Sequence, residues 1–318
     1  MSKKLTVINK ELTVVMYHYV RPIKDSIYPQ IKGLELTSFI SQLEYISRNY
    51  TVISSADLVN AQNKNYDLPL NPILLTFDDG YLDHYKYVMP ELIKRNFKGL
   101  FFPPRVAIQE RRVLDVNKIH FILERCKDKS LIIEDIEKFI EEATSEELLP
   151  IKEYRREYFV SNRYDDANVN YIKRILQTGL PYELRNDLTN SLFTKYVSAD
   201  EKSFADELYV SENNLKEMLE AGMEIGSHGD QHPWLNRISK EDQYIDIKNS
   251  MKMLDEIGVD KKAFYFCYPY GGYNEDTLNI LRSLDFAAAF TTKPKKYNIS
   301  SEDILQVSRF DTNDIPGQ

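Results

Sequence analysis

The sequence predicts an α/β protein with a largely parallel sheet and one helical insertion. Short apolar runs that end in polar or glycine-containing turns alternate with amphipathic helical stretches along most of the 318 residues. Between residues 106 and 208 this alternation stops, and charged, helix-like sequence takes its place. We therefore expect a single domain over residues 1–318 that carries a helical insertion at residues 106–208.

Six apolar runs have the length and composition of buried strands. They lie at residues 12–17, 73–77, 100–102, 223–226, 263–266 and 286–290. Several polar residues follow directly after these runs. Because α/β proteins build their sites at the carboxyl ends of parallel strands, we expect the functional residues at that edge.

Four helices are predicted outside the insertion, at residues 37–46, 87–96, 212–221 and 241–257. The first begins with Thr37 as its capping residue. It places Phe39, Leu43 and Ile46 on one side, which is typical of a helix with one buried face.

Composition and charge exclude several classes of protein. With 42% hydrophobic and 28% charged residues, the chain is neither disordered nor membrane-like. A net charge of −8 argues against nucleic acid or an anionic membrane as the main partner, because both attract a basic surface. We find no apolar run long enough for a membrane span and no signal-peptide pattern, so we expect a cytoplasmic protein. The two cysteines, Cys126 and Cys267, predict no disulfide framework.

Two of the five histidines, His228 and His232, lie four residues apart directly after a predicted strand. One helical turn at this spacing brings two imidazoles to the same side, where they can bind one ion. The same spacing is also found in incidental surface or core pairs, so it does not identify a metal site by itself.

Two adjacent carboxylates, Asp78 and Asp79, follow the strand at residues 73–77. Like charges at such close range raise one pKa, and a cation would relieve the repulsion. The ordinary alternative is a solvated Asp-Asp-Gly turn. One aspartate with His228 and His232 would give three ligands and leave a position for water, as in catalytic zinc sites. The other aspartate would then be free to act as a base.

Three motifs follow one another along the chain: Thr76-Phe77-Asp78-Asp79-Gly80, Ser227-His228 to His232, and Tyr268-Pro269-Tyr270-Gly271. Their order resembles the first three motifs of the polysaccharide deacetylases, carbohydrate esterase family 4, also called the NodB-homology domain. The opening run of residues 15–20, with Tyr17-His18, is similar to the branch that contains the poly-N-acetylglucosamine deacetylases. The resemblance covers about residues 12–105 and 209–310. It implies a distorted, incomplete (β/α) barrel.

The resemblance also implies roles for these residues. Asp78 would be the catalytic base, and Asp79, His228 and His232 would bind one divalent metal, with Zn²⁺ as the expected ion. The backbone N–H of Tyr270 would help to stabilise the oxyanion. The implied activity is hydrolysis of the N-acyl group, with N-acetyl expected, from an amino sugar. Because we find no signal-peptide pattern, and because the long insertion could turn an open groove into a closed pocket, we expect this sugar to belong to a cytosolic surface-glycan precursor or an oligosaccharide. Oligomers could form through the helical insertion.

Two departures from the family pattern affect these roles. An arginine usually precedes the third motif, but Phe266, Cys267 and Tyr268 fill that stretch here. Arg309 is our candidate for its place or for substrate binding, with an ordinary surface arginine as the alternative. The C-terminal Leu-x-His motif that usually supplies the general acid is also absent. In the branch with the early Tyr-His, that histidine supplies the acid, so His18 is our candidate, and a packed core histidine is the alternative.

The remaining candidates are less specific. Trp234 could form an apolar wall of the sugar site, although core packing is an equal expectation, and His84 and His120 are expected to be structural. Two other functions stay open: a catalytically silent glycan-binding or scaffold protein, and a hydrolase of a non-sugar amide C–N bond. The two departures from the pattern motivate the first of these alternatives.

Overall fold

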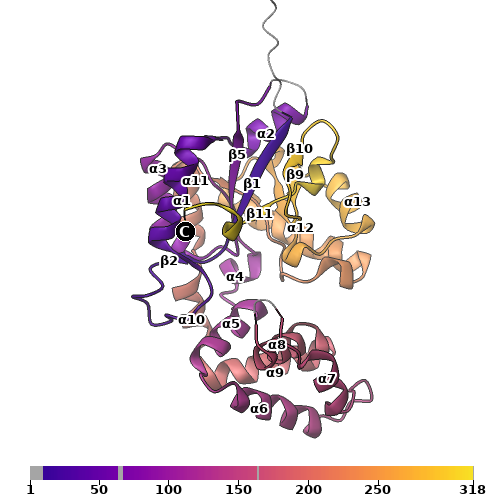
Figure 1. Cartoon of the computed structure of the whole chain (residues 1–318). Coiled ribbons are helices and arrows are strands. Elements are labelled where there is room, and N and C mark those ends of the chain that lie inside the picture. Colours follow the sequence, from indigo (N-terminus) through magenta and orange to yellow (C-terminus); the bar gives the residue numbers. More distant parts are fainter. Residues whose placement is uncertain (1–9, 64–66, 163–164, 318) are drawn as a thin grey trace, which may run out of the picture. The chain divides into compact units, whose positions relative to one another are not determined.

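The computed structural model describes residues 10–63, 67–162 and 165–317, and the chain divides into two compact units (Figure 1). The first unit consists of Met1–Pro22, Gly33–Arg111 and Asp206–Gln318. The second consists of Ile23–Lys32 and Arg112–Ala205. It contains most of the insertion predicted at residues 106–208 and also takes in Ile23–Lys32, which the sequence did not suggest. The single domain over residues 1–318 stays a prediction.

The first unit is built on a mainly parallel sheet, which confirms the predicted α/β class. Its described strands are β1 (Glu11–Tyr17), β4 (Thr51–Val52), β5 (Pro72–Asp78), β6 (Leu100–Phe102), β7 (Glu224–Ile225), β10 (Tyr297–Asn298) and β11 (Phe310–Asp311). The order along the main path is β10-β1-β5-β6-β7, with β11 paired to β1 and β4 paired to β5. The β10–β1 pair is antiparallel, and the other pairs in this sheet are parallel.

Two smaller parallel pairs are formed by β2 (Val20–Arg21) with β3 (Leu34–Glu35) and by β8 (Tyr265–Cys267) with β9 (Ala288–Phe290). Single parallel bridges join the β8–β9 pair to the ends of the main sheet, from Ser227 to Phe266 and from Phe290 to Val307. The strands therefore return to β1 through isolated bridges rather than continuous ladders. This is the geometry of a distorted, incomplete barrel.

The core of the first unit lies inside this barrel. Alternate residues of β1, β5, β6, β8 and β9 meet in one buried apolar cluster, because successive side chains of a strand point to opposite faces. The cluster includes Leu12, Val14, Leu74, Leu100, Phe102, Cys267, Ala288, Phe290 and Val307. On β5, Asp78 lies two positions after Thr76 and four positions after Leu74. The same alternation therefore directs its side chain to the interior, at the end of the strand.

The helices of the first unit are α1 (Leu36–Asn49), α2 (Ser55–Gln62), α3 (Met89–Lys94), α4 (Arg105–Gln109), α11 (Glu212–Glu220), α12 (Lys240–Ile257) and α13 (Glu275–Ser283). The four helices predicted outside the insertion are present as α1, α3, α11 and α12, and α2, α4 and α13 are additional. The predicted cap at Thr37 is wrong. Strand β3 runs directly into α1, so Glu35 is the N-cap residue and its side chain makes no capping hydrogen bond.

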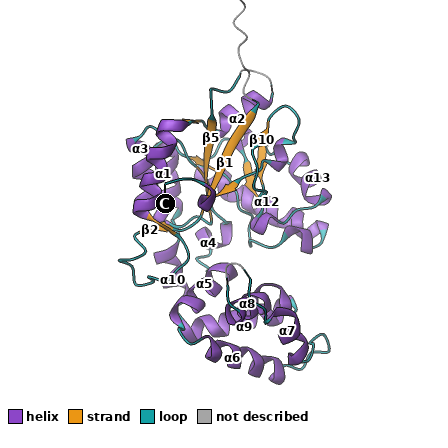
Figure 2. Ribbon diagram, viewed as in Figure 1, coloured by secondary structure: helices purple, strands orange, loops and turns teal. Residues whose placement is uncertain are grey.

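The second unit contains helices and loops and no strand among its described residues (Figure 2). Its helices are α5 (Asp115–Arg125), α6 (Lys129–Glu142), α7 (Ile151–Tyr158), α8 (Ala167–Arg174) and α9 (Tyr182–Tyr196), and α10 (Glu201–Leu208) follows them. The rings of Phe121 and Phe193 each pack edge-on against Phe204, with centroids 4.9 and 5.2 Å away. This unit therefore has an apolar core of its own.

No helix that the structure describes combines the length and the apolar character that crossing a membrane requires.

Candidate active site

The two adjacent carboxylates lie at the end of β5 and face different partners. Asp78 is the last residue of the strand, and Asp79 and Gly80 follow it with left-handed φ angles of 71° and 66°. Position 80 requires glycine on two grounds, since a Cβ there would lie 2.8 Å from the Cβ of Pro103. The backbone turns at Asp79 and Gly80, directly after the strand ends. As a result Asp78 points into the barrel end and Asp79 points towards the histidines.

Asp78 is held by Arg309, which directly precedes β11. Nη1 and Nη2 of the arginine donate to Oδ1 and Oδ2 of Asp78, each over 2.8 Å. Its other donors reach the hydroxyl of Thr76, the Sγ of Cys267 and the carbonyl of Thr291. All five N–H donors of the guanidinium are thus used, and the residue is 1% exposed. The surface-arginine alternative is wrong, and Arg309 has no donor left for a substrate.

This contact sets the charge of Asp78. Burial alone would raise its pKa, but the guanidinium of Arg309, with a smaller contribution from His228, holds the pKa below its usual range. Asp78 is therefore ionised at neutral pH although it is buried. An ionised carboxylate is the form that can accept a proton.

Asp79, His228 and His232 bring three ligand atoms together. Oδ1 of Asp79 lies 3.5 Å from Nε2 of His228 and 3.6 Å from Nε2 of His232. One ligand atom from each residue lies within 4.8 Å of the other two, and all three residues are buried. Nδ1–H of His228 donates to the carbonyl of Cys267 over 2.8 Å, which leaves Nε2 of that ring as a lone-pair donor.

The charges of this group fit a divalent cation. Burial, with a smaller contribution from the nearby His228, lowers the pKa of His232 to about 3. Burial also lowers the pKa of His228. Both imidazoles are therefore neutral at pH 7, and neither of them supplies a positive charge to the buried Asp79. Neutral imidazoles and one carboxylate are the donor set that zinc prefers.

The second oxygen of Asp79 is occupied by a tyrosine. The hydroxyl of Tyr81 donates to Oδ2 over 2.5 Å, and the ring of Tyr19 stacks on Tyr81 with a centroid separation of 4.1 Å. Oδ1 is thereby left to face the two imidazoles. Tyr81 did not stand out in the sequence, although it follows the Asp-Asp-Gly turn immediately.

The segment from His228 to His232 is a loop, so the helical turn that we assumed for this spacing is wrong. Gly229 and His232 have left-handed φ angles of 80° and 58°. The carboxylate of Asp246, on α12, accepts the backbone N–H groups of Asp230 and Gln231 over 2.9 and 2.8 Å. A Cβ at position 229 would lie 2.7 Å from Oδ2 of Asp246. The loop shape depends on this buried carboxylate, which the sequence showed only as an acidic residue on a helical face.

His18 lies at the end of β1, beside Asp78. Its side chain is 43% exposed, and its Nε2 lies 3.9 Å from Oδ2 of Asp78, so the packed-core alternative is wrong. The backbone carbonyl of His18 accepts a hydrogen bond from Nε2 of His84 over 2.8 Å. His84 is buried, burial lowers its pKa to about 4, and it opens the π-helical turn His84–Val88 before α3. His120 is in α5, outside the unit that contains this site.

Tyr270 and Trp234 form one aromatic stack. Tyr270 has a left-handed φ of 57°, and its ring lies 4.6 Å from the indole of Trp234 at an interplanar angle of 2°. Its edge also meets His232 at 4.7 Å, and the guanidinium of Arg237 lies over the indole at 4.8 Å. Trp234 is partly buried and supports Tyr270, which in turn contacts a histidine of the ligand group. Its place in a sugar subsite stays a prediction.

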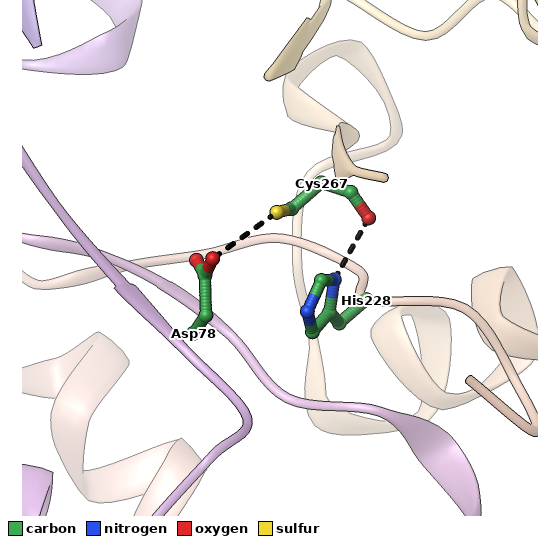
Figure 3. A group of neighbouring side chains, drawn as sticks. All are labelled: Asp78, His228 and Cys267. Carbon is green, nitrogen blue, oxygen red and sulfur yellow. Dashed lines mark hydrogen bonds between the residues drawn. The ribbon is translucent and has the colours of Figure 1, made fainter. Parts of the chain in front are cut away.

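Cys267 lies between Asp78 and His228 (Figure 3). Its Sγ is 3.4 Å from Oδ2 of Asp78, and its backbone carbonyl accepts the hydrogen bond from His228. These three residues also have donor atoms close enough for one ion. However, the guanidinium of Arg309 contacts both Asp78 and Sγ, and its positive charge disfavours a cation there. Asp79, His228 and His232 are therefore the better metal group.

Comparisons with known proteins agree with the motifs. A family profile described as Polysaccharide deacetylase matches residues 152–289, which is less than half of the chain and includes both His228 and His232. YxkH of Bacillus subtilis (strain 168), provisionally named as a polysaccharide deacetylase, is 30% identical over 93 residues. That match covers 29% of this chain and spans about a third of the relative, 33% of its length.

Solved structures of deacetylases share the fold. The Streptococcus pyogenes deacetylase PplD in complex with acetate has a TM-score of 0.57 and 17% identity, over 96% of this chain and 93% of PplD. IcaB from Ammonifex degensii has a TM-score of 0.55 and 20% identity, over 96% and 92% of the two chains. At these identities the likeness shows the fold alone, and it confirms the barrel expected from the motifs. The profile and YxkH confirm the predicted resemblance.

Proposed function

We propose that this chain, which carries a polysaccharide deacetylase domain, is a metal-dependent hydrolase that removes the N-acetyl group of an amino sugar. The observation that carries the proposal is the division of two adjacent carboxylates between two environments. Asp78 is bound to Arg309, and Asp79 faces two neutral imidazoles. A base beside a three-ligand metal group is the combination that metal-assisted amide hydrolysis needs.

The metal ligands in this proposal are Asp79, His228 and His232, and Zn²⁺ is the expected ion. When bound, a divalent cation would supply a Lewis acid for the acyl carbonyl and would favour loss of a proton from water. Tyr81 keeps Oδ1 of Asp79 turned to the imidazoles, and the carbonyl of Cys267 orients His228. Such outer hydrogen bonds fix the ligand atoms before the ion arrives.

The proton transfers are assigned to two side chains, Asp78 and His18. Asp78, kept ionised by Arg309, takes a proton from the attacking water, whose oxygen becomes part of the released acetate. His18, which is partly exposed and 3.9 Å from Asp78, gives a proton to the amine as the C–N bond breaks. The backbone N–H of Tyr270 is the protein donor for the oxyanion in this scheme.

The substrate and its location complete the proposal. We take the substrate to be an N-acetylated amino sugar in a soluble nucleotide-linked, lipid-linked or small glycan precursor, handled in the cytoplasm. Acetate release from such precursors and not from insoluble polymer is the expected result. Release from polymer alone would contradict the precursor substrate, and fractionation of cells that make the protein would test its location.

The decisive experiment measures bound metal and acetate release together on wild type, Asp78→Asn and Asp79→Asn. We expect about one equivalent of metal in wild type and in Asp78→Asn, with activity lost in both variants and metal lost in Asp79→Asn. Asp255→Asn is the matched control, because Asp255 is an exposed carboxylate near the end of α12.

Two other outcomes would support the alternative functions. Absence of bound metal even after zinc addition would overturn the enzyme proposal and support a glycan-binding or scaffold protein. Bound metal with no acetate release from any sugar would support hydrolysis of a non-sugar amide C–N bond. Oligomers formed through residues 106–208 are a separate prediction, tested by the mass of the protein in solution.

A further inference from the structure

Cys267 is buried at the point where the base and a metal ligand meet. It is the last residue of β8 and is 0% exposed. Its side chain points to Asp78 and its carbonyl points to His228, so one residue contacts both (Figure 3). The proposed roles of Asp78 and of the metal ligands do not use the sulfur, although it makes two polar contacts.

The two contacts of the sulfur need a neutral thiol. Nη2–H of Arg309 donates to Sγ over 3.0 Å, and the S–H donates to Oδ2 of Asp78 over 3.4 Å. Burial raises the pKa of the Cys267 thiol well above its usual range, which keeps the proton on the sulfur. A neutral, inaccessible thiol is neither a nucleophile nor a metal ligand.

We propose that Cys267 is a positioning residue of the reaction, which fixes the orientation of the Asp78 carboxylate through a hydrogen bond from its thiol. This inference rests on the proposed function, in which Asp78 is the base. Oδ2 of Asp78 accepts hydrogen bonds from Nη2–H of Arg309 and from the thiol of Cys267. The same oxygen lies 3.9 Å from Nε2 of His18. The thiol therefore helps to decide which way this oxygen faces.

The sulfur also completes the hydrogen bonding of the Arg309 guanidinium. Sγ is the acceptor for one N–H of Arg309 in a site from which water is excluded by burial. Without the sulfur, that N–H and one lone pair of Asp78 would lose a partner together. The interaction between His228 and Cys267 uses the backbone carbonyl, so it survives any side-chain substitution at this position. Loss of the thiol should therefore affect the base and leave the metal ligand in place.

The first experiment compares kcat, KM and metal content for wild type, Cys267→Ala and Cys267→Ser. In Cys267→Ala we expect kcat to fall about tenfold or more, with KM and metal content unchanged, because the lost hydrogen bond involves a charged group that acts on the attacking water and does not bind the sugar. Cys267→Ser should recover most of kcat, since a hydroxyl can also donate to Asp78 and accept from Arg309. Cys126→Ala is the matched control, because this second buried cysteine lies in the other unit.

Two kinetic results would overturn the proposal. One is an unchanged kcat in Cys267→Ala. The other is a kcat in Cys267→Ser as low as in Cys267→Ala, because the sulfur would then matter through packing alone.

A second measurement does not depend on activity. In a Cys126→Ala background Cys267 is the only thiol of the chain, since the sequence has 2 cysteines. Its S–H infrared band should lie at lower frequency than that of an unbonded thiol, and Asp78→Asn should move it upward. A band at the unbonded frequency that does not respond to Asp78→Asn would overturn the proposal. An inactive wild type would count against the proposed function. The infrared band would still show whether the thiol of Cys267 donates a hydrogen bond to Asp78.

Discussion

Arg309 and Asp78 form a buried bidentate pair, with both arginine–oxygen distances at 2.8 Å. The two residues are 231 positions apart in the sequence. They meet because β5 and β11 flank β1 in parallel, and the two-residue β11 pairs only with Val15 and Met16, near the carboxyl-terminal end of β1, where β5 also approaches its last residue. Arg309, our candidate for the place of the arginine missing from the third motif, thus contacts Asp78 from another part of the chain.

Replacing Arg309 with methionine should destabilise the protein and abolish activity. A buried ion pair that loses one partner leaves an uncompensated charge, and such losses cost about 3–5 kcal/mol. Urea unfolding and acetate release measure the two effects. Arg282→Met is the control, because Arg282 pairs with Asp303 at the surface, where an ion pair contributes about 1 kcal/mol or less. Equal losses in the two variants would contradict the importance of the buried pair.

Removing the hydroxyl of Tyr81 should weaken metal binding. In Tyr81→Phe the second oxygen of Asp79 loses its donor, and outer hydrogen bonds of this kind are worth about 10–100-fold in metal affinity. Competition with a chelator measures the affinity for zinc. Tyr85→Phe, which removes a partly exposed hydroxyl bonded to Glu217, should bind zinc like wild type. A zinc affinity in Tyr81→Phe within twofold of wild type would argue against this role.

Removing His18 should stop proton donation and leave the metal in place. General acids contribute about 10²–10⁴-fold, so we expect His18→Gln to lose at least about 100-fold in kcat with normal zinc content. His120→Gln is the matched control, because it removes a histidine of the helical unit. If His18→Gln keeps wild-type kcat on the same substrate, another group is the acid.

Asp246 should make the metal-free protein less stable as the pH rises. Burial raises its pKa to about 6, above the value near 4 expected when the chain is unfolded. Between these two values the folded protein holds a proton that the unfolded chain releases, so the stabilising contribution is present below pH 4 and lost by pH 6. This difference of about two pKa units corresponds to about 3 kcal/mol of unfolding free energy.

Unfolding of wild type and Asp246→Asn with a chelator present, from pH 4 to pH 7, tests this contribution. The difference between the two unfolding free energies should change across this window. Identical pH profiles would contradict the raised pKa. Asp242→Asn, at an exposed position near the start of the same helix, serves as the control.

The strands were predictable where they lie in a buried apolar run, which holds for the long β1 and β5 and for the short β6, β7, β8 and β9, and not elsewhere. β1 and β5 are seven residues each and are almost wholly buried, which gives parallel strands their continuous apolar runs. The two-residue strands β4, β10 and β11 carry no such pattern, and pairing with longer neighbours defines them. The conformation of the 228–232 loop was also not predictable, because two left-handed residues and a distant carboxylate fix it.

The site was predictable only for residues that carry a local motif. Asp78, Asp79, His228 and His232 stand in recognisable spacing, and the structure brings them together. Arg309 could equally have been a surface residue, since its partners lie far away in the sequence. Asp246 and Cys267 belong to an ordinary helix and an ordinary strand by their patterns. Only the packing shows which polar atoms they meet.

The adjacency of Asp78 and Asp79 makes the chemistry sensitive to strand register. β5 is paired on both sides, with Phe77 opposite Tyr17 of β1 and Asp78 opposite Phe102 of β6. A slip of one residue would turn every side chain of β5 to the opposite face. Depending on the direction of the slip, Asp79 would take the position of Asp78 at the arginine, or Asp78 would take the position of Asp79 at the imidazoles. A single inserted or deleted residue within β5 would thus keep both acidic groups in the chain and still leave one of the two positions without a carboxylate.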